Sequence, residues 1–576
     1  MDEKDGPVRR RVGWHVGVLC VLLIALWGVL DLDSSFTTDE GTYALQARAS
    51  RDNGGDVGYA FLEVDPRGEH QPYFGAVFDG RQVRTYVSHP AWPGLLAVAA
   101  GIFGEALGFR IFGVTSIVVV AIASWAIAAR IGSSRAGPWA FWIAAASPVA
   151  ANGWILWAHA PSAACGALLA WATLQARVDR RWLVAVAASA GAGVLLRSEG
   201  VLWALAVAGG AAMVGALERR WRDLLPAAVG VATAATTLVA ERSWSASLTQ
   251  GSSGDTLTAR GTVGDLGRRL DAAVTSLLDG GIGPGPERWL GFLGVLCVAL
   301  VVVGVVKGSV ELTGLRLVAV LAISTCRVAV ASDVPATGLF AAAPLLLLCA
   351  VPAGVSGRAP IRVGAGPDPA ATDRAGRRAL AAACGAFALL VLATQYDDGG
   401  SLQWGGRFFS PLLGVLAAFA GIGARRLLGS VGAAGAGRLS SERFVAGVLA
   451  ASLVVQGGAA VLITERVRRS NGEAIEQVVA LGPDVLVAST TQIPRLDWRG
   501  WPERCWLAAP IGELGRVLEV VAAAGVDRVA FAGFDATEVR SVAGAVTAET
   551  GRRYGVVDLE ASGPRRVSPP YRCLGR

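Results

Sequence analysis

Apolar runs of about 16 to 24 residues recur from Trp14 to Thr464, and short polar connections rich in arginine separate them. A helix of about 20 apolar residues is long enough to cross the roughly 30 Å hydrocarbon layer of a bilayer. The pattern therefore predicts thirteen membrane-spanning helices. They are expected near residues 13–32, 109–130, 136–153, 160–177, 182–197, 200–217, 222–241, 289–307, 314–331, 335–353, 379–396, 407–425 and 443–464.

The positions of the arginines predict the direction of these spans. The first run follows Arg9–Arg11, and no small-residue cleavage site comes after it, so we interpret it as a retained helix with its N-terminus in the cytoplasm. The basic residues then gather in the inner connections, and the short outer turns carry only Arg197. Counting His89–Gly108 as a span would move Arg130 and Arg135 outside. We therefore expect that segment to be an amphipathic helix in the outer interface.

Three larger regions are predicted to lie outside the membrane: residues 33–108, residues 242–288 and the tail 465–576. In the tail the apolar runs become short and alternate between strand-like and helix-like periods. The expected strands are 484–489, 505–509, 527–534 and 554–561, and the expected helices are 513–524 and 537–550. The fold class is thus an all-α polytopic membrane bundle (residues 1–464) followed by a small extracytoplasmic α/β domain (residues 465–576). The stretches 354–378 and 429–437 are predicted to be flexible linkers.

Composition agrees with a membrane protein and excludes an ordinary soluble enzyme. Of the 576 residues, 53% are apolar and 17% are charged, whereas soluble domains carry about 25% charged residues. The net charge of +7 comes from arginines in short connections, so it reflects topology and does not indicate nucleic-acid binding.

The chain has eight cysteines, and six of them stand alone within apolar runs, where they are interpreted as packing residues. Cys505 and Cys573 are the two in the tail. Because an oxidising compartment permits disulfides, we predict that these two form one.

The stretch from Ser35 to Arg48, directly after the first span, carries the adjacent carboxylates Asp39 and Glu40. A carboxylate at the bilayer boundary can remove a proton from the hydroxyl or amine of a substrate anchored in the same plane. Asp39 and Glu40 are therefore the predicted catalytic residues. The competing interpretation is a helix N-cap with a solvated acidic pair.

Arginines near outer helix ends are candidates for binding a lipid phosphate. Arg407 follows Trp404-Gly405-Gly406, where glycines would let a phosphate approach the backbone, and the guanidinium fork suits phosphate oxygens. Arg327 lies within a predicted span, where an arginine is a functional candidate by default. The alternatives are an interfacial Arg407 that reaches water and an Arg327 that pairs with Asp333.

Further polar candidates lie at the same predicted outer face. His89 is assigned to phosphate binding, and a substrate-binding group is expected from His159, Arg197, Glu199 and Asp397. Each histidine could equally be a hydrogen-bonded structural residue, and Arg197 with Glu199 could be a satisfied pair that closes a helix turn.

A metal site is left unassigned. Asp31-Leu32-Asp33 and Asp397-Asp398 could offer oxygen ligands to a divalent metal such as Mg²⁺ or Mn²⁺. The sequence has no P-loop, no Gly-x-Ser-x-Gly elbow and no zinc-type cluster, and no cofactor is predicted with certainty.

Several motifs together resemble the GT-C membrane glycosyltransferases, in particular relatives of protein O-mannosyltransferases and lipid A aminoarabinose transferases. In chain order they are "TTDEGTYALQARA", "YVSHPAWPGLLAVAAGIFG", "FRIFGVTS", "LLRSEGVLW" and "WGGRFFSPLLG". The resemblance implies that Asp39 is the catalytic base and that the helix after His89 lies in the outer interface. The chain departs from the family with His-Pro-Ala at His89 and Arg-Ser-Glu at Arg197.

These observations lead to one function and two alternatives. We expect a multi-pass glycosyltransferase of a bacterial cytoplasmic membrane that moves a sugar from a polyprenyl-phosphate donor to an extracytoplasmic glycan, lipid or protein acceptor, with inversion. The alternatives are a flippase of lipid-linked sugars and a polysaccharide ligase with a pyrophosphate lipid donor. A flippase would need polar residues through the depth of the membrane, whereas the clearest ones here gather at one face.

Overall fold

The computed structural model describes nineteen segments of the chain. They are residues 6–30, 32–73, 76–78, 83–85, 89–219, 224–249, 266–279, 286–307, 312–330, 336–351, 374–394, 405–433, 442–480, 485–500, 504–509, 513–526, 529–533, 555–557 and 572–575. The predicted helix 537–550 and almost all of the predicted linker 354–378 lie outside these residues.

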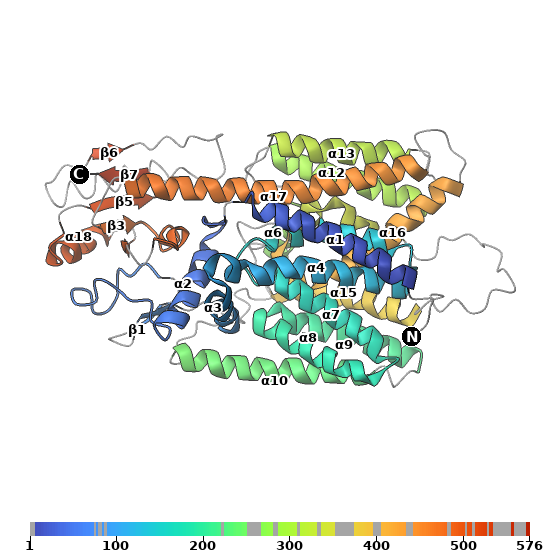
Figure 1. The fold of residues 1–576 in the computed structure, drawn as a ribbon, viewed down its shortest axis with the longest axis horizontal. Helices are drawn as coiled ribbons and strands as arrows, with labels where there is room; N and C mark the ends of the chain where they lie inside the picture. Colours follow the sequence, from blue (N-terminus) through green and yellow to red (C-terminus); the bar gives the residue numbers. More distant parts are fainter. Residues whose placement is uncertain are drawn as a thin grey trace.

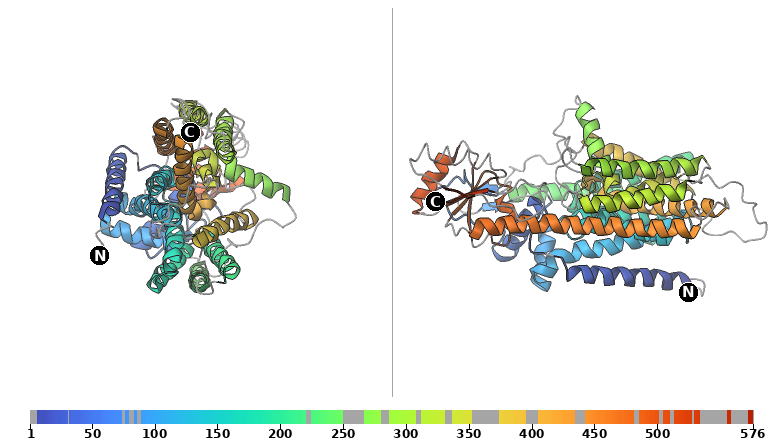
Figure 2. Two further views of the ribbon diagram at one scale, coloured as in Figure 1. Left: turned by 90° about the vertical axis from the view of Figure 1, so that its right-hand side faces the viewer. Right: turned by 90° about the horizontal axis from the view of Figure 1, so that it is seen from above.

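Long helices run side by side through most of the molecule, and a small sheet lies beyond one end of this bundle (Figures 1 and 2). Among the described residues, eight helices are long and apolar enough to cross a membrane. They are α4 (Glu105–Ile131), α9 (Glu199–Leu217), α10 (Leu224–Thr249), α12 (Pro286–Val306), α13 (Thr313–Val330), α15 (Arg374–Thr394), the 3-10 helix η5 (Arg407–Leu412) with α16 (Leu413–Ala433), and α17 (Glu442–Ala480). Each contains or overlaps one predicted span.

The other five predicted spans are also helical, although they are not among these eight helices. Three of them are α1 (Gly6–Trp27), α7 (His159–Ala176) and α8 (Leu183–Leu196, preceded by η2, Arg180–Trp182). The remaining two are each divided, into α5 (Gly137–Ala145) and α6 (Val149–Asn152), and into α14 (Leu339–Ala342) and η4 (Pro344–Ala350).

Proline explains both interruptions. Pro148 is the N-cap of α6 and Pro344 opens η4. Proline lacks a backbone N–H and disfavours helical backbone in the preceding residue, so a helix tends to end before it. The expectation of thirteen uninterrupted helices is therefore wrong at these two places.

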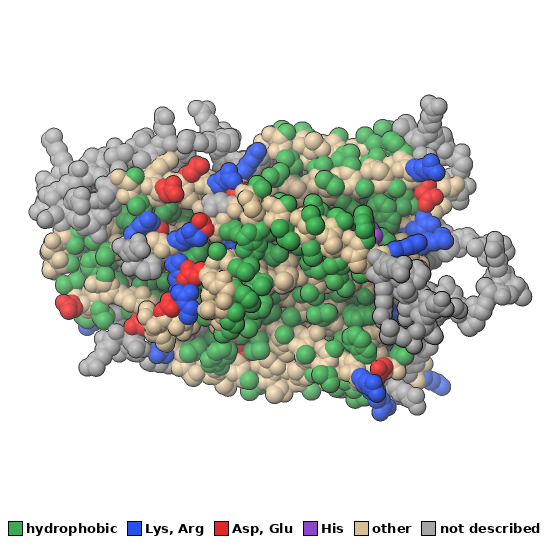
Figure 3. All heavy atoms as spheres, in the orientation of Figure 1, with side chains coloured by type: hydrophobic (Ala, Val, Ile, Leu, Met, Phe, Trp, Pro, Cys, Tyr) green, Lys and Arg blue, Asp and Glu red, His purple; other side chains and the backbone are tan. Residues whose placement is uncertain are grey.

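The surface of the bundle is apolar along its length. Figure 3 shows a broad region of hydrophobic side chains on the bundle, with charged side chains gathered at its two ends. Ile24, Ile102, Leu389 and Val454 are among the large apolar side chains that are more than half exposed. Exposing such a surface to water costs free energy, whereas contact with lipid does not, so the chain is a multi-pass membrane protein.

The first predicted outer region is built from α2 (Thr38–Asp52), the hairpin of β1 (Ala76–Phe78) and β2 (Val83–Thr85), and α3 (Ala91–Phe103). The helix expected after His89 is thus present as α3, which packs against α2 and α4. In the second predicted outer region, α10 continues to Thr249 and α11 (Leu266–Leu278) forms a further helix.

The C-terminal sheet has the strand order β4-β3-β5-β7-β6. The strands β3 (Val485–Ala488), β4 (Cys505–Ala508), β5 (Val529–Gly533) and β6 (Gly555–Val557) confirm the four predicted strands, and α18 (Leu514–Ala523) confirms a predicted helix. The sequence reading missed β7 (Arg572–Gly575) and the short helix η7 (Pro494–Asp497). The pairs β3–β4 and β3–β5 are parallel, whereas β7 pairs antiparallel with both β5 and β6.

The predicted disulfide between Cys505 and Cys573 is wrong. Cys505 is a free thiol in β4, and two strands, β3 and β5, separate β4 from β7, which carries Cys573. Neighbouring strands lie about 4.8 Å apart, so this separation is about 14 Å, twice the roughly 7 Å that a disulfide can bridge between Cα atoms.

The predicted domain boundary at residue 464 falls inside one continuous helix. The 39 residues of α17 correspond to about 58 Å at 1.5 Å per residue, and Figure 1 shows α17 running from the bundle to the sheet. The first outer region also joins the sheet, because Phe61 packs in the core with Val485 and Leu507, and the Ala508 N–H donates to the His70 carbonyl at 2.8 Å. Residues 33–108 and the C-terminal sheet therefore form one assembly at the end of the bundle.

A close backbone contact in this assembly is between α2 and η7. A Cβ added at Gly41 would lie 1.6 Å from the carbonyl oxygen of Arg495 and 2.6 Å from its carbonyl carbon. These are backbone atoms, so they cannot move aside as a flexible side chain can. Only glycine fits at position 41 while η7 stays in place.

We therefore expect Gly41→Ala to release η7 from α2 and to lower the melting temperature of the protein in detergent. Gly209→Ala is the matched control, because a Cβ at Gly209 in α9 meets nothing within 4 Å. Limited proteolysis of the C-terminal domain should accelerate in the first variant only. Equal melting and equal proteolysis of both variants would contradict the close packing of η7 on α2.

Candidate active site

Asp39 lies between two arginines that come from distant parts of the chain. Its Oδ2 is 3.7 Å from Nη1 of Arg407 at the start of η5, and its Oδ1 is 3.5 Å from Nη1 of Arg495 in η7. The Asp39 side chain is 41% exposed, whereas Arg407 and Arg495 are 16% and 6% exposed. The carboxylate is thus partly exposed at the protein surface, and an arginine faces each of its two oxygens.

Two glycines in left-handed conformations set the position of Arg407. Gly405 has φ 67° and Gly406 has φ 61°, and their N–H groups donate to the carbonyls of Ala336 and Thr337 at 2.7 and 2.6 Å. A Cβ at Gly405 would lie 2.2 Å from Cγ of Pro148. These glycines therefore serve close packing within the protein, which is a different role from the predicted approach of a phosphate to the backbone.

Aromatic rings surround the Arg407 guanidinium. Its central carbon is 5.7 Å from the centre of the Trp157 ring and 5.0 Å from that of Phe408. His159, at the start of α7, is buried and packs edge-on against Trp157, with the two ring centres 4.9 Å apart. His159 thus supports the Trp157 ring on which Arg407 packs, whereas its predicted binding of substrate stays a prediction.

Sequence reasoning missed Arg495. Its Nε donates to the Thr491 carbonyl at 2.9 Å, so the side chain is fixed within its own domain while Nη1 faces Asp39. No motif in the sequence distinguishes Arg495 from the other arginines of the tail. The available signal was Gly41 beside Asp39, because a glycine inside a helix indicates a close approach of another backbone.

Tyr43 and the pair Arg197 and Glu199 line the same region. Arg197 holds Glu199 through two hydrogen bonds, from Nε to Oε2 at 3.0 Å and from Nη2 to Oε1 at 2.8 Å, which confirms the satisfied pair. Burial raises the pKa of Tyr43 to about 12, although the positive charge of Arg197 acts in the opposite direction. The Tyr43 hydroxyl therefore stays protonated near neutral pH.

His89 connects the beginning of α3 to the turn between α8 and α9. Its Nε2 accepts a hydrogen bond from the Ser198 N–H at 3.1 Å, and its Nδ1 lies 3.5 Å from Oε1 of Glu241. Burial and then the charge of Arg197 lower the pKa of His89 to about 4, so the ring is neutral at pH 7. A neutral ring whose Nε2 already accepts a hydrogen bond from a backbone N–H does not offer a cation to a phosphate. The described contacts of His89 are with Ser198 and Glu241, and its binding of phosphate stays a prediction.

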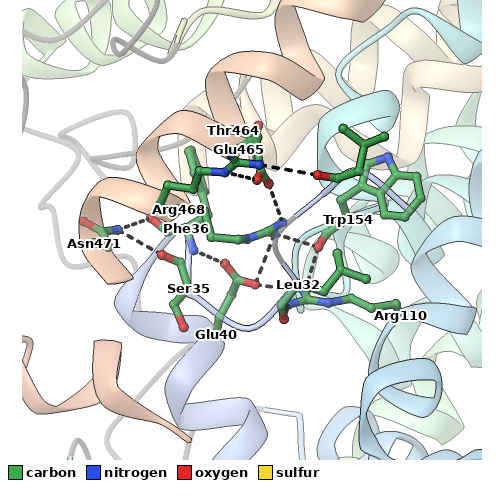
Figure 4. Close-up of polar contacts among 12 residues, drawn as sticks. Leu32, Ser35, Phe36, Glu40, Arg110, Trp154, Thr464, Glu465, Arg468 and Asn471 are labelled. Carbon is green, nitrogen blue, oxygen red and sulfur yellow. Dashed lines mark hydrogen bonds and ion pairs between the residues drawn. The ribbon is translucent and has the colours of Figure 1, made fainter. Parts of the chain in front are cut away.

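Glu40 is fully buried and has a structural role (Figure 4). Its Oε1 accepts from the N–H groups of Phe36 and Thr37 at 2.6 and 3.3 Å, which caps α2. Its Oε2 accepts from Arg110 Nη1 at 3.1 Å and from the Leu156 N–H at 3.0 Å. Both oxygens are thus occupied and inaccessible, so the structure contradicts a catalytic role for Glu40.

Of the two remaining predicted residues, Arg327 is described and does not pair with Asp39. Arg327 lies in α13, and its Nη1 donates to the Ala341 carbonyl of α14 at 3.4 Å. Asp397 lies outside the described residues.

The candidate metal ligands are only partly described. Asp31, Asp397 and Asp398 lie outside the described residues, whereas Asp33 pairs with Arg499. Within the described part of the chain, no three His, Cys, Asp or Glu side chains are grouped so that they could hold a metal ion.

Comparison with solved structures identifies the fold. The chain matches ArnT from Cupriavidus metallidurans bound to undecaprenyl phosphate, with 15% sequence identity and a TM-score of 0.50, over 98% of both chains. It matches the apo state of the same protein with a TM-score of 0.51. The chain shares the fold of ArnT.

A further match is to the archaeal oligosaccharyltransferase AglB from Archaeoglobus fulgidus, with 13% identity and a TM-score of 0.45, over 94% of this chain and 72% of AglB. No protein-family model and no curated protein matches the sequence. The ArnT-like fold extends through the C-terminal domain, because the match covers nearly the whole chain.

The adjacent carboxylates should respond differently to neutralisation. Glu40→Gln leaves the buried Arg110 without its carboxylate, and breaking a buried ion pair costs about 3–5 kcal/mol. Asp39→Asn removes only long, partly exposed ion pairs, which are worth about 0–1 kcal/mol each. Thermal unfolding in detergent should therefore show a large fall in melting temperature for Glu40→Gln and a small one for Asp39→Asn. The reverse order would contradict the structural assignment of Glu40.

Proposed function

We propose that this protein is a membrane glycosyltransferase that takes a sugar from a polyprenyl-phosphate donor and transfers it to an acceptor outside the cytoplasm. The observation that carries the proposal is the accessible Asp39 carboxylate facing Arg407. One group can act as a base and the other as a phosphate-binding cation, and they lie side by side. The ArnT structure of the same fold is bound to undecaprenyl phosphate, which supports a lipid phosphate as the donor here.

The arrangement of the ends of the chain supports an outer site. Helix α1 begins at the end of the bundle that is farthest from the sheet (Figures 1 and 2). With the N-terminus in the cytoplasm, as the arginines near it predict, the end of the bundle with Asp39 and the C-terminal sheet lies outside. Nucleotide sugars are not present there, so a lipid-linked donor suits the site. The proposed location is a bacterial cytoplasmic membrane.

The proposed reaction is a single displacement at the anomeric carbon of the sugar. Asp39 accepts the proton of the acceptor hydroxyl or amine as the bond from the acceptor to the anomeric carbon forms. The bond between that carbon and the phosphate oxygen breaks, and the electron pair stays on the phosphate. The Arg407 guanidinium stabilises the negative charge that develops there. A single displacement inverts the configuration of the sugar.

We expect Asp39→Asn to abolish transfer while donor binding is retained, because the amide keeps the size of the side chain but cannot accept the proton. Arg407→Gln should weaken donor binding, since a charge-assisted contact contributes about 1.5–3 kcal/mol. The measurement is transfer and donor binding in proteoliposomes with a polyprenyl-phosphate sugar.

Asp52→Asn is the matched control, because Asp52 ends the same helix and pairs with Arg51 at the surface. It should transfer sugar as the wild type does. Wild-type transfer by Asp39→Asn would contradict its role as base. Transfer from a pyrophosphate lipid alone would favour a polysaccharide ligase over the proposed enzyme.

A further inference from the structure

The C-terminal domain reaches the candidate active site through one short element, η7. The backbone of Arg495 lies directly against Gly41 of α2, as described above. Three residues further on, the carbonyl of Trp498 accepts a hydrogen bond from Arg48 Nη1 at 2.7 Å, and the Arg48 guanidinium stacks over the Trp498 ring at 4.7 Å. Trp498 also contacts Phe109 of α4. The position of η7 is therefore fixed by contacts of Arg495 and Trp498 with α2 and α4.

This docking places the Arg495 guanidinium on the side of Asp39 opposite to Arg407. Arg407 faces Oδ2 and Arg495 faces Oδ1, at 3.7 and 3.5 Å. Both distances exceed the roughly 2.7–2.9 Å of a charge-assisted hydrogen bond. The carboxylate thus lies between the two cations without a short bond to either, so an incoming anion can replace it.

The side chains of Asp39, Arg407 and Arg495 together carry a net charge of +1. Arg407 and Arg495 carry two positive charges and Asp39 carries one negative charge, while Arg197 and Glu199 neutralise each other through their two hydrogen bonds. A sugar linked through a phosphodiester to a polyprenol brings one negative charge. When the sugar leaves, the phosphate becomes a monoester and gains a second charge. Two guanidinium groups match this final state better than one.

We propose that Arg495 and Arg407 together bind the phosphate of the lipid donor, so that the C-terminal domain supplies half of the phosphate site. This inference rests on the proposed function and adds the residue and the domain that complete the site. Asp39 occupies the position between the two cations when no donor is bound. When the phosphate enters, it takes over the two guanidinium groups, and the carboxylate is released to accept the proton of the acceptor.

The alternative is that Arg495 pairs with Asp39 only to dock the C-terminal domain. The two roles predict different changes in the affinity of the protein for a charged lipid and for an uncharged one. A phosphate-binding residue affects the affinity for a polyprenyl phosphate and leaves that for the matching polyprenol unchanged. A docking residue affects domain stability and has no preference between the two lipids.

The test measures binding of a polyprenyl monophosphate and of the polyprenol of the same length to the full chain in detergent. Arg495→Gln should lower the affinity for the phosphate at least about tenfold, as expected for loss of one charge-assisted contact, and should leave polyprenol binding unchanged. Arg516→Gln is the matched control, because Arg516 is exposed on α18 of the same domain. It should bind both lipids as the wild type does.

Asp39→Asn adds a second measurement, and this variant by itself leaves Arg495 unchanged. Removing the carboxylate removes an anion that competes with the phosphate for the two arginines, so the affinity for the phosphate should rise. Arg495→Gln in the same chain should cancel part of that gain. Arg495→Lys keeps a cation and should restore part of the affinity if the Gln variant melts early.

An affinity for the phosphate within twofold of wild type in Arg495→Gln, together with a loss in Arg407→Gln, would overturn this inference and leave the proposed donor intact. Equal binding of phosphate and polyprenol by the wild type would instead overturn the proposed donor, and the inference with it.

Discussion

The buried carboxylate of Glu40 is the interaction on which the candidate site depends. One side chain binds the beginning of α2, Arg110 of α4 and the backbone before α7, and Arg468 of α17 lies 3.9 Å from the same oxygen (Figure 4). Arg110 and Arg468 also donate to one carbonyl, that of Trp154, at 2.7 and 2.8 Å. An isolated buried charge would be very costly, so these partners are required together and fix one arrangement of four chain segments.

That anchor determines where Asp39 points. Successive residues of an α-helix are turned by about 100°, so a helix that directs Glu40 into the protein directs Asp39 away from that anchor. The side chain of Asp39 is accordingly 41% exposed, while Glu40 is buried. Gly41, the next residue, admits the backbone of η7. Three consecutive residues of α2 therefore serve as anchor, candidate base and docking point.

Local sequence features predicted much of this fold, because most of its elements are determined by their own residues. The apolar runs became helices, and the strands of the tail followed from alternating short runs. The proximity of Asp39 and Arg407 was also expected, because the sequence assigned both residues to the outer face of the membrane. Pro148 and Pro344 could have indicated the two broken spans, because proline acts on its own neighbours. The continuity of α17 beyond residue 464 was missed because the change from apolar to charged residues marks the end of the lipid layer and does not end a helix.

The remaining features depend on contacts between distant segments, which a single sequence does not reveal. The spacing of Thr37 and Glu40 matches a capping box and could have indicated that Glu40 caps α2. The burial of Glu40 depends on the distant Arg110 and Leu156, which its own neighbours do not indicate. Arg495 lies more than 450 residues from Asp39, and its approach depends on how η7 docks. The disulfide prediction failed for the same reason, since strand order decides which cysteines are neighbours.

The central claim is that Asp39, Arg407 and Arg495 form one site that binds the phosphate of the donor lipid. The two arginines of this site come from separate domains. A structure determined with a bound polyprenyl phosphate tests it most directly. The account predicts that the phosphate lies between the guanidinium groups of Arg407 and Arg495, within hydrogen-bond distance of both, and that Asp39 has moved away from at least one of them. A phosphate bound elsewhere on the protein, with both Asp39 ion pairs intact, would contradict the account.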